Sequence, residues 1–250
     1  MPIFDAHLHI IDPRFPIVEN QGYVPKAFTA DDYRQSVSRF DVRGGAIVSG
    51  SFQGFDQMYL LDALQALGDR FVGVTQLPAT VSDREILELH EKGVRALRFN
   101  VMRGGPETIA QLDYFARRVH DIAGWHAELY IDSKDLGELM ETIVSLPAAS
   151  IDHLGLSKQG LPELLKLVNQ GVKVKATGFG RLDFDAAEAV RTIHGVNPEA
   201  LLFGTDLPST RAKTPFQESD IDLIQETLGE QQAEKVLYRN ALTWYGIEER

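Results

Sequence analysis

The protein has 250 residues, a formal net charge of −11 and no cysteine. A chain without cysteine has no disulfide, thiolate metal ligand or cysteine nucleophile. The acidic balance argues against a nucleic-acid partner, which needs a basic surface, but it allows a small anionic ligand held by a local cluster of arginines. The first residues, MPIFDAHLHI, lack the basic start and long apolar run of a signal peptide, and no stretch approaches 18 consecutive apolar residues. We therefore expect a cytoplasmic protein without a membrane span, and the sequence leaves its oligomeric state open.

Eight short apolar runs are spaced along the chain, and several are rich in Val, Ile or Phe. Near-continuous apolar runs are typical of strands buried on both faces, as in a parallel sheet. The expected strands are Ile3–His9, Gly45–Ser49, Phe71–Gln76, Val94–Asn100, Ala127–Ile131, Ser150–His153, Val172–Ala176 and Leu201–Thr205.

The segments between these runs show the apolar spacing of helices. Ser82 and Glu85 form the S-x-x-E capping-box pattern that starts a helix. Gly93, Gly124 and Gly171 stand where helices should end before the next strand. Helical spacing predicts helices over Pro106–Ala123, from Ser133 to Ile143, and over Leu161–Val168, Ala186–Ile193 and Ile221–Leu228.

This alternation of strand and helix predicts an α/β fold. Eight such repeats in one chain favour a (β/α)8 TIM barrel of parallel strands, with residues 1–250 as a single domain. An open doubly wound sheet is the alternative, and the glycine-rich turn Gly50–Gly54 is its main support. The first strand is not followed by G-x-G-x-x-G, so a dinucleotide site is disfavoured. In either fold the site is expected at the carboxyl ends of the strands.

Two histidines, His7 and His9, lie at positions i and i+2 of the first expected strand. Residues at this spacing share one face of a strand, so both point into the lumen of a barrel. Two buried polar rings are costly there unless they are hydrogen-bonded or bind a ligand. The pair alone fits a structural role and a catalytic role about equally well.

Two further candidates stand at strand ends. His153 ends the sixth expected strand and Asp206 ends the eighth. Taken singly, His153 fits a hydrogen-bonded core histidine, and Asp206 fits a turn or capping residue before Pro208. The ends of strands one, six and eight nevertheless meet at one barrel mouth. Convergence of all four side chains therefore favours an active site.

With these four residues in these positions, the sequence resembles the amidohydrolase superfamily. The H-x-H on strand one, the histidine on strand six and the aspartate on strand eight carry the resemblance. Segments 124–130, 151–155, 174–178 and 203–208, read as GWHAELY, IDHLG, VKATG and FGTDLP, are similar to the amidohydrolase-2 branch. Within that branch they resemble 2-pyrone-4,6-dicarboxylate hydrolases and related sugar-lactone hydrolases, and the resemblance runs from residue 3 to about residue 245.

Many members of the superfamily bind divalent metals through these groups, so the resemblance raises the question of a metal site. The resemblance makes His7, His9 and Asp206 the possible ligands, with zinc as the metal. Strand four has arginines in place of a bridging Lys or Glu, and His126 stands at the start of strand five, about 13 Å from the catalytic face. Dicarboxylate lactonases of this branch work without a metal, and we expect no required cofactor.

Lactone hydrolysis needs a base for water, donors for the carbonyl and cations for any carboxylate. We assign Asp206 as the base, with His7, His9 and His153 polarising the carbonyl. The resemblance implies that substrate carboxylates are bound by arginines and tyrosines near the mouth. The substrate-binding candidates are Arg98, Arg103, Tyr130, Tyr23, Arg181 and Asn100.

Other functions share this pattern and remain open. A metal-dependent decarboxylase, amidase or phosphoesterase would use His7, His9 and Asp206 as metal ligands. Metal-dependent deoxyribonucleases also begin with H-x-H on a barrel strand, but the net charge opposes that assignment. A non-catalytic binding protein is the remaining alternative. The sequence does not separate a pyrone dicarboxylate from a sugar lactone as substrate.

Overall fold

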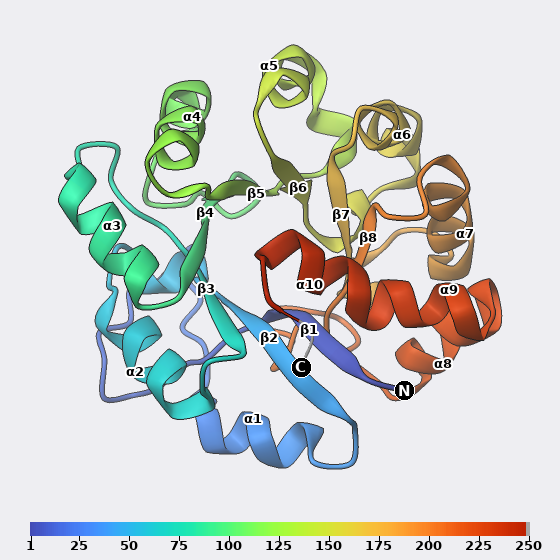
Figure 1. Ribbon diagram of the computed structural model, residues 1–250, viewed down its shortest axis with the longest axis horizontal. Helices are drawn as coiled ribbons and strands as arrows, with labels where there is room; N and C mark the ends of the chain where they lie inside the picture. Colours follow the sequence, from blue (N-terminus) through green and yellow to red (C-terminus); the bar gives the residue numbers. More distant parts are fainter. Residues whose placement is uncertain (249–250) are drawn as a thin grey trace.

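The computed structural model describes residues 1–248 and shows a parallel eight-stranded sheet curled into a barrel (Figure 1). The strands follow the order of the chain, each paired in parallel with the next. Between the two ends of the sheet, the Asp206 amide donates to the His7 carbonyl (2.7 Å) and the His9 amide to the Leu207 carbonyl (2.8 Å). These two bonds join β1 to the segment after β8. The strands are β1 (Ile3–Leu8), β2 (Val42–Val48), β3 (Phe71–Thr75), β4 (Val94–Asn100), β5 (His126–Tyr130), β6 (Ala149–Ile151), β7 (Lys173–Ala176) and β8 (Leu201–Phe203).

Helices surround the barrel, and α10 crosses one end of it in Figure 1. The capping box predicted at Ser82 is present at the start of α3, and Gly124 ends α4 in the left-handed conformation. The helices are α1 (Ala30–Val37), α2 (Met58–Leu67), α3 (Asp83–Glu91), α4 (Leu112–Ala123), α5 (Met140–Ser145), α6 (Leu161–Asn169), α7 (Ala186–Val196), α8 (Ser219–Leu228), α9 (Glu230–Glu234) and α10 (Asn240–Tyr245), with a π-helical turn at Lys235–Arg239 between the last two.

Two expected helices are shorter than their apolar spacing predicts. The helix expected from Pro106 begins at Leu112. Residues 101–108 form a loop instead, in which the Gly105 amide donates to the Asn100 carbonyl (2.7 Å). The helix expected after Ser133 is divided into short 3-10 turns before α5, and Gly137 interrupts it with a positive φ of 21°. Both loops lie at the carboxyl ends of strands and help to form the barrel mouth.

Strand β2 begins at Val42, three residues before its predicted start. Gly44 and Gly45 weaken the apolar pattern there, but the packing requires them. A Cβ on Gly44 would lie 2.5 Å from the Arg70 carbonyl, and one on Gly45 would lie 2.8 Å from the Asp5 carbonyl. Glycine therefore allows adjacent backbones to approach closely.

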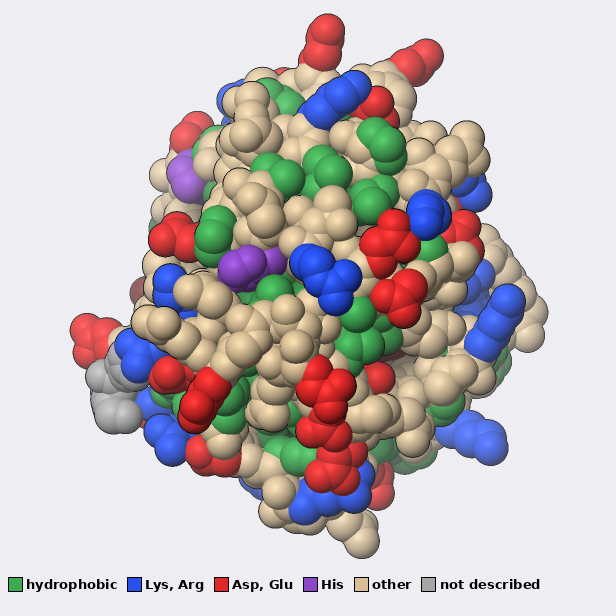
Figure 2. All heavy atoms as spheres, turned by 90° about the vertical axis from the view of Figure 1, so that its right-hand side faces the viewer, with side chains coloured by type: hydrophobic (Ala, Val, Ile, Leu, Met, Phe, Trp, Pro, Cys, Tyr) green, Lys and Arg blue, Asp and Glu red, His purple; other side chains and the backbone are tan. Residues whose placement is uncertain are grey.

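The outer surface mixes both signs of charge. On the face shown in Figure 2, acidic and basic side chains are interspersed, which agrees with the net charge of −11 and differs from the basic stripe of a nucleic-acid-binding protein. None of the helices within residues 1–248 combines the length and the apolar character needed to cross a membrane.

Candidate active site

The four predicted catalytic side chains lie together at the carboxyl end of the barrel. Ring centroids of His7 and His9 are 5.0 Å apart, and those of His7 and His153 are 4.9 Å apart. Asp206 Oδ1 lies 3.5 Å from His9 Nε2 and 3.9 Å from His7 Nε2. All four residues are at most 4% exposed. The structure therefore brings together His7 of β1 and three residues that follow β1, β6 and β8, up to 199 positions apart from His7 to Asp206.

The orientation of His9 follows from its hydrogen bond to the backbone. Its Nδ1 lies 2.7 Å from the carbonyl oxygen of Val48, at the end of β2. A carbonyl oxygen only accepts, so Nδ1 carries the proton and Nε2 of the neutral ring has a free lone pair. That lone pair faces Asp206 Oδ1. A water hydrogen, a proton or a metal ion between the two atoms would relieve their repulsion.

His7 lies deeper in the barrel, between two carboxylates. Its Nδ1 is 3.5 Å from Asp152 Oδ1, and its Nε2 faces Asp206. Neither ring nitrogen has a hydrogen-bond partner among the described residues. Burial lowers the pKa of His7 to about 4, even though Asp152 acts in the opposite direction. His7 is therefore neutral at pH 7.

His153 is held by an unusual backbone. The φ angles of His153, Leu154 and Leu156 are 52°, 51° and 67°, in the left-handed region that non-glycine residues rarely adopt. A Cβ on Gly178 would lie 2.7 Å from His153 Nδ1, so only glycine leaves room for the ring. Such strain persists where the surrounding structure fixes it, and it is concentrated at functional sites. Burial also lowers the pKa of His153 well below its usual range.

Asp206 is held from both sides. Its own φ is 59°, and the preceding residue, Thr205, donates through its amide and hydroxyl to the buried carboxylate of Asp5 (2.8 and 2.6 Å). Arg181 donates to Asp206 Oδ2 (2.8 Å from Nε). Burial alone would favour the neutral acid, but Arg181 and the nearby histidines hold the pKa of Asp206 well below its usual range. Asp206 is therefore ionised, and its Oδ1 faces His7 and His9 without a hydrogen-bond partner within residues 1–248.

Asp152 is a site residue that the sequence reasoning missed. It follows β6 directly and is completely buried. Arg98 donates to its Oδ2 (2.8 Å), and its Oδ1 faces His7. Adjacent strand residues normally point to opposite faces. The left-handed turn at His153 removes that alternation, so both side chains reach the same mouth.

Four side chains near the mouth line two adjoining cavities of about 30 and 200 Å³. They are the predicted Arg103, Tyr130 and Arg181, together with Arg211 from the loop after β8. The smaller cavity lies over His9 and His153. These cationic and phenolic groups are suited to an anion with a polar ring.

The loop after β1 crosses this mouth. The side-chain amides of Asn20 and Gln21 both donate to the Arg103 carbonyl (3.1 Å each). Arg211 donates to the Asn20 carbonyl, and its guanidinium lies 4.3 Å from the ring centroid of Tyr23. The predicted ligand Tyr23 thus lines neither cavity and instead packs on Arg211.

Two other predicted substrate ligands have partners within the protein. Arg98 is only 3% exposed and donates to the Ser49 carbonyl (2.7 Å) as well as to Asp152. Asn100 lines the smaller cavity, and its Oδ1 accepts from the Arg103 amide (3.1 Å). His126 lies at the start of β5, as predicted, where Trp244 donates to its Nε2 (2.9 Å).

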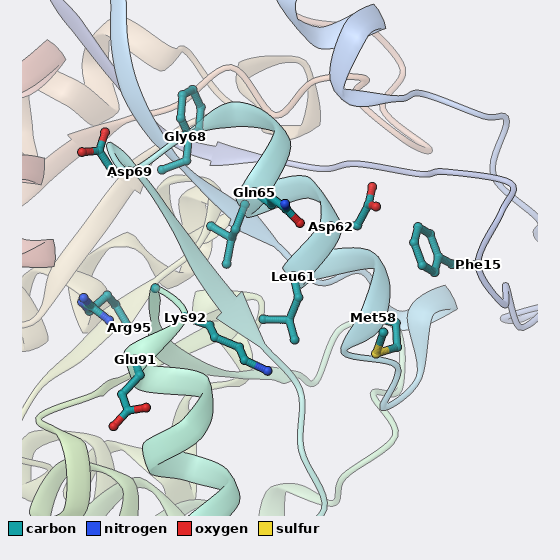
Figure 3. A pocket seen from close by; sticks show the side chains of 13 residues that line it. Phe15, Met58, Leu61, Asp62, Gln65, Gly68, Asp69, Glu91, Lys92 and Arg95 are labelled. Atoms are coloured by element: carbon teal, nitrogen blue, oxygen red, sulfur yellow. The ribbon is translucent and has the colours of Figure 1, made fainter.

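A wider hollow of about 780 Å³ lies elsewhere, on the outer wall beside α2, β3 and α3 (Figure 3). Phe15, Met58, Leu61 and Asp62 line one part of it, and Lys92 and Arg95 line another. It contains none of the predicted catalytic residues. Size alone therefore does not identify the site, whereas the convergence of histidines and carboxylates does.

The residues at the mouth fit a divalent metal ion. The candidate ligand atoms of His7, His9 and Asp206 all lie within 4.8 Å of one another. Two imidazole nitrogens and a carboxylate oxygen form a common catalytic zinc set. His7, Asp152 and His153 meet the same distance limit. Strand β4 contributes arginines instead of a bridging Lys or Glu, so the described residues offer a site for one metal ion.

Comparison with known proteins agrees with the motifs. The amidohydrolase family model matches residues 4–247. A 2-pyrone-4,6-dicarboxylate hydrolase from Comamonas testosteroni is 25% identical, covering 98% of this chain and 90% of its own length. A 4-sulfomuconolactone hydrolase from Rhizobium radiobacter is 26% identical, covering 82% and 75%. In fold, a probable 2-pyrone-4,6-dicarboxylic acid hydrolase from Acinetobacter baumannii is similar with a TM-score of 0.84 and 20% identity, over 98% of this chain and 100% of that one. The chain therefore belongs to the amidohydrolase family of enzymes.

Proposed function

We propose that the protein hydrolyses the lactone ring of a small anionic substrate, using a single barrel domain. One observation carries the proposal. An ionised, buried Asp206 faces His7 and His9, with His153 beside His7, and Arg103, Arg181 and Arg211 surround the same mouth. The names of the two relatives described above, hydrolases of a pyrone dicarboxylate and a sulfonated lactone, support a carboxylated or sulfonated ring.

The catalytic steps follow from the donors and acceptors. A water beside Asp206 Oδ1 gives its proton to that carboxylate and attacks the lactone carbonyl. The ring C–O bond then breaks, and the proton on Asp206 passes to the leaving oxygen, which yields a hydroxy acid. Because His9 uses its Nδ1 proton on Val48, its Nε2 accepts a hydrogen bond from the water. His153, which lines the inner cavity, is the neutral imidazole placed to polarise the carbonyl.

Substrate entry requires movement at the mouth. A cavity of about 30 Å³ over His9 and His153 is much smaller than the several hundred Å³ of typical small-molecule sites. Arg103 and Arg211 line both cavities, and residues 20–23 contact these two arginines from the loop after β1. Displacement of this loop and of Arg103, Arg181 and Arg211 onto the substrate would join the two cavities into one.

A metal-dependent hydrolase or decarboxylase is the second candidate. The observation that favours it is the lone pair of His9 Nε2, which lies 3.5 Å from an ionised carboxylate oxygen, so that a cation between the two atoms would relieve their repulsion. His7, His9 and Asp206 would hold the ion. Bound zinc would lower the pKa of a coordinated water and polarise a substrate oxygen.

Hydrolysis of a lactone panel tests the proposal. The panel contains 2-pyrone-4,6-dicarboxylate, a sulfonated muconolactone and uncharged aldonolactones, each assayed with metal-stripped and zinc-supplemented enzyme. We expect turnover of the anionic lactones by stripped enzyme. Turnover that requires zinc would support the second candidate. If none of the lactones is hydrolysed under either condition, the lactonase proposal fails.

A further inference from the structure

We infer that Asp152 is the positioning residue for His7 and that Arg98 anchors Asp152, so that the two histidines of the H-x-H pair present the same nitrogen to the site. This inference rests on the proposed function for its kinetic consequence. Its structural content, the tautomer of His7, is independent of any substrate.

His7 lies between two carboxylates, and the nearer one favours a single tautomer, because Asp152 Oδ1 is 3.5 Å from Nδ1 whereas Asp206 Oδ1 is 3.9 Å from Nε2. Nδ1 of His7 and Oδ1 of Asp152 are both buried, and neither has another hydrogen-bond partner among the described residues. An unpaired buried donor and an unpaired buried acceptor are each costly, whereas a small shift of the ring would satisfy both. The proton of neutral His7 therefore belongs on Nδ1, and Nε2 keeps its lone pair toward Asp206.

The arrangement of His7 matches that of its neighbour on β1. His9 donates Nδ1–H to the Val48 carbonyl, and its Nε2 also faces Asp206 Oδ1. A backbone carbonyl fixes one ring and a carboxylate fixes the other. The two Nε2 lone pairs thus meet on one side of Asp206 and can hold the same water or the same cation.

The carboxylate of Asp152 needs an anchor of its own, because an ionised acid inside a barrel is costly unless it is paired. Arg98 supplies the anchor: its Nη2 donates to Asp152 Oδ2 (2.8 Å), and its Nη1 donates to the Ser49 carbonyl (2.7 Å). This second bond ties the guanidinium to the end of β2, next to the carbonyl that fixes His9. Arg98 lines the smaller cavity as well, but these two bonds give it a defined role in holding Asp152.

The experiment compares wild type, Asp152→Asn, Asp152→Glu and Glu128→Gln. Histidine side chains are labelled with ¹⁵N, and the ring-nitrogen shifts of unliganded His7, assigned with a His7→Gln variant, report its tautomer. An Asn side chain that keeps its carbonyl on Arg98 presents an NH₂ to Nδ1. We therefore expect Asp152→Asn to move the His7 proton to Nε2 and to lower kcat about 10–100-fold, with KM changed less than about threefold.

The other variants separate positioning from folding. Asp152→Glu keeps the charge and should retain the wild-type tautomer and recover part of kcat. Glu128→Gln removes a different buried carboxylate and should leave the His7 tautomer unchanged. Arg98→Met should lower kcat, whereas an Arg98 that binds substrate would raise KM instead. An unchanged His7 tautomer in Asp152→Asn would overturn the inference. A wild type with the Nδ1–H tautomer but no lactone turnover would leave it standing and refute the proposed function alone.

Discussion

The two ends of the barrel interior both bury charged groups, but they differ in how completely those groups are hydrogen-bonded. At the floor, near α10, Glu128 pairs with Lys175, accepts from the Tyr245 hydroxyl (2.7 Å) and lies 3.0 Å from His126 Nε2. At the mouth, six buried atoms of two histidines, Asp206, Asp152 and Arg98 lack a hydrogen-bond partner among the described residues. They are Nδ1 and Nε2 of His7, Nε of Arg98, Oδ1 of Asp152, Nδ1 of His153 and Oδ1 of Asp206.

This difference in pairing distinguishes buried groups with a structural role from those that are candidates for a functional one. Buried polar groups in native proteins are nearly always paired, so a satisfied network such as that of Glu128 is explained by stability alone. Unpaired atoms that converge on one point need a ligand, a water or an ion to explain them. The strained φ angles of His153 and Asp206 occur at the same end. Backbone strain and unpaired polar atoms therefore occur together at the mouth, as expected of the proposed active site.

The largest effect is expected from removing the proposed base at the mouth. Asp206→Asn keeps the shape of the side chain but cannot take a proton from water, so kcat on the best lactone should fall about 10²–10⁴-fold. Circular dichroism and the unfolding midpoint check that the barrel is intact. A kcat within a few-fold of wild type would exclude Asp206 as the base.

At the floor, the expected loss is in stability. Lys175→Met leaves Glu128 buried without its cation, which should cost about 3–5 kcal/mol of unfolding free energy, measured by urea denaturation. The double variant Lys175→Met, Glu128→Leu removes both charges and should recover most of that loss. If the single variant is as stable as wild type, the pairing of Glu128 with Lys175 does not stabilise the floor as proposed.

Acid should affect His7 at the mouth before it affects Glu128 at the floor. Burial lowers the pKa of His7 from its ordinary value of 6.5 to about 4 in the folded protein. The neutral ring therefore contributes fully above about pH 6.5, and its contribution of about 3 kcal/mol is lost as the pH falls through 4. Burial opposes the ionisation of Glu128, but Lys175 and His126 lower its pKa to about 2 from 4.5, so its contribution is lost only between those values.

Urea unfolding at a series of pH values from 7 to 4 measures this difference. We expect the unfolding free energy of wild type to fall over the range, and that of His7→Gln to fall less, because the variant has no imidazole to protonate. Equal pH dependence in the two proteins would show that His7 is not protonated on unfolding in this range.

The smallest of these effects concerns anion recognition by Arg181. Arg181→Met should raise KM for carboxylated lactones about 10–100-fold, the loss of one charge-assisted hydrogen-bonded contact. KM for an uncharged lactone should change much less. A similar change for both substrates would mean that Arg181 serves only to hold Asp206 in place, through the 2.8 Å bond described above.

Much of this molecule was predictable from its sequence. Apolar runs defined all eight strands, because strands buried on both faces need little polar patterning, and Gly124 and the Ser82 capping box act locally. His7, His9, His153 and Asp206 were predictable because parallel strand ends meet at one mouth in any barrel.

Only the tertiary structure decided how these groups are paired. Asp152 was hidden beside His153 because strand alternation predicts opposite directions for neighbours, and a left-handed turn overrides it. Arg98 and Arg181 both matched substrate ligands by sequence position, but each guanidinium binds a carboxylate of the protein. A sequence gives the charge and the approximate depth of a side chain. The partner is set by distances of a few ångströms between separate strands, which exist only after the barrel closes.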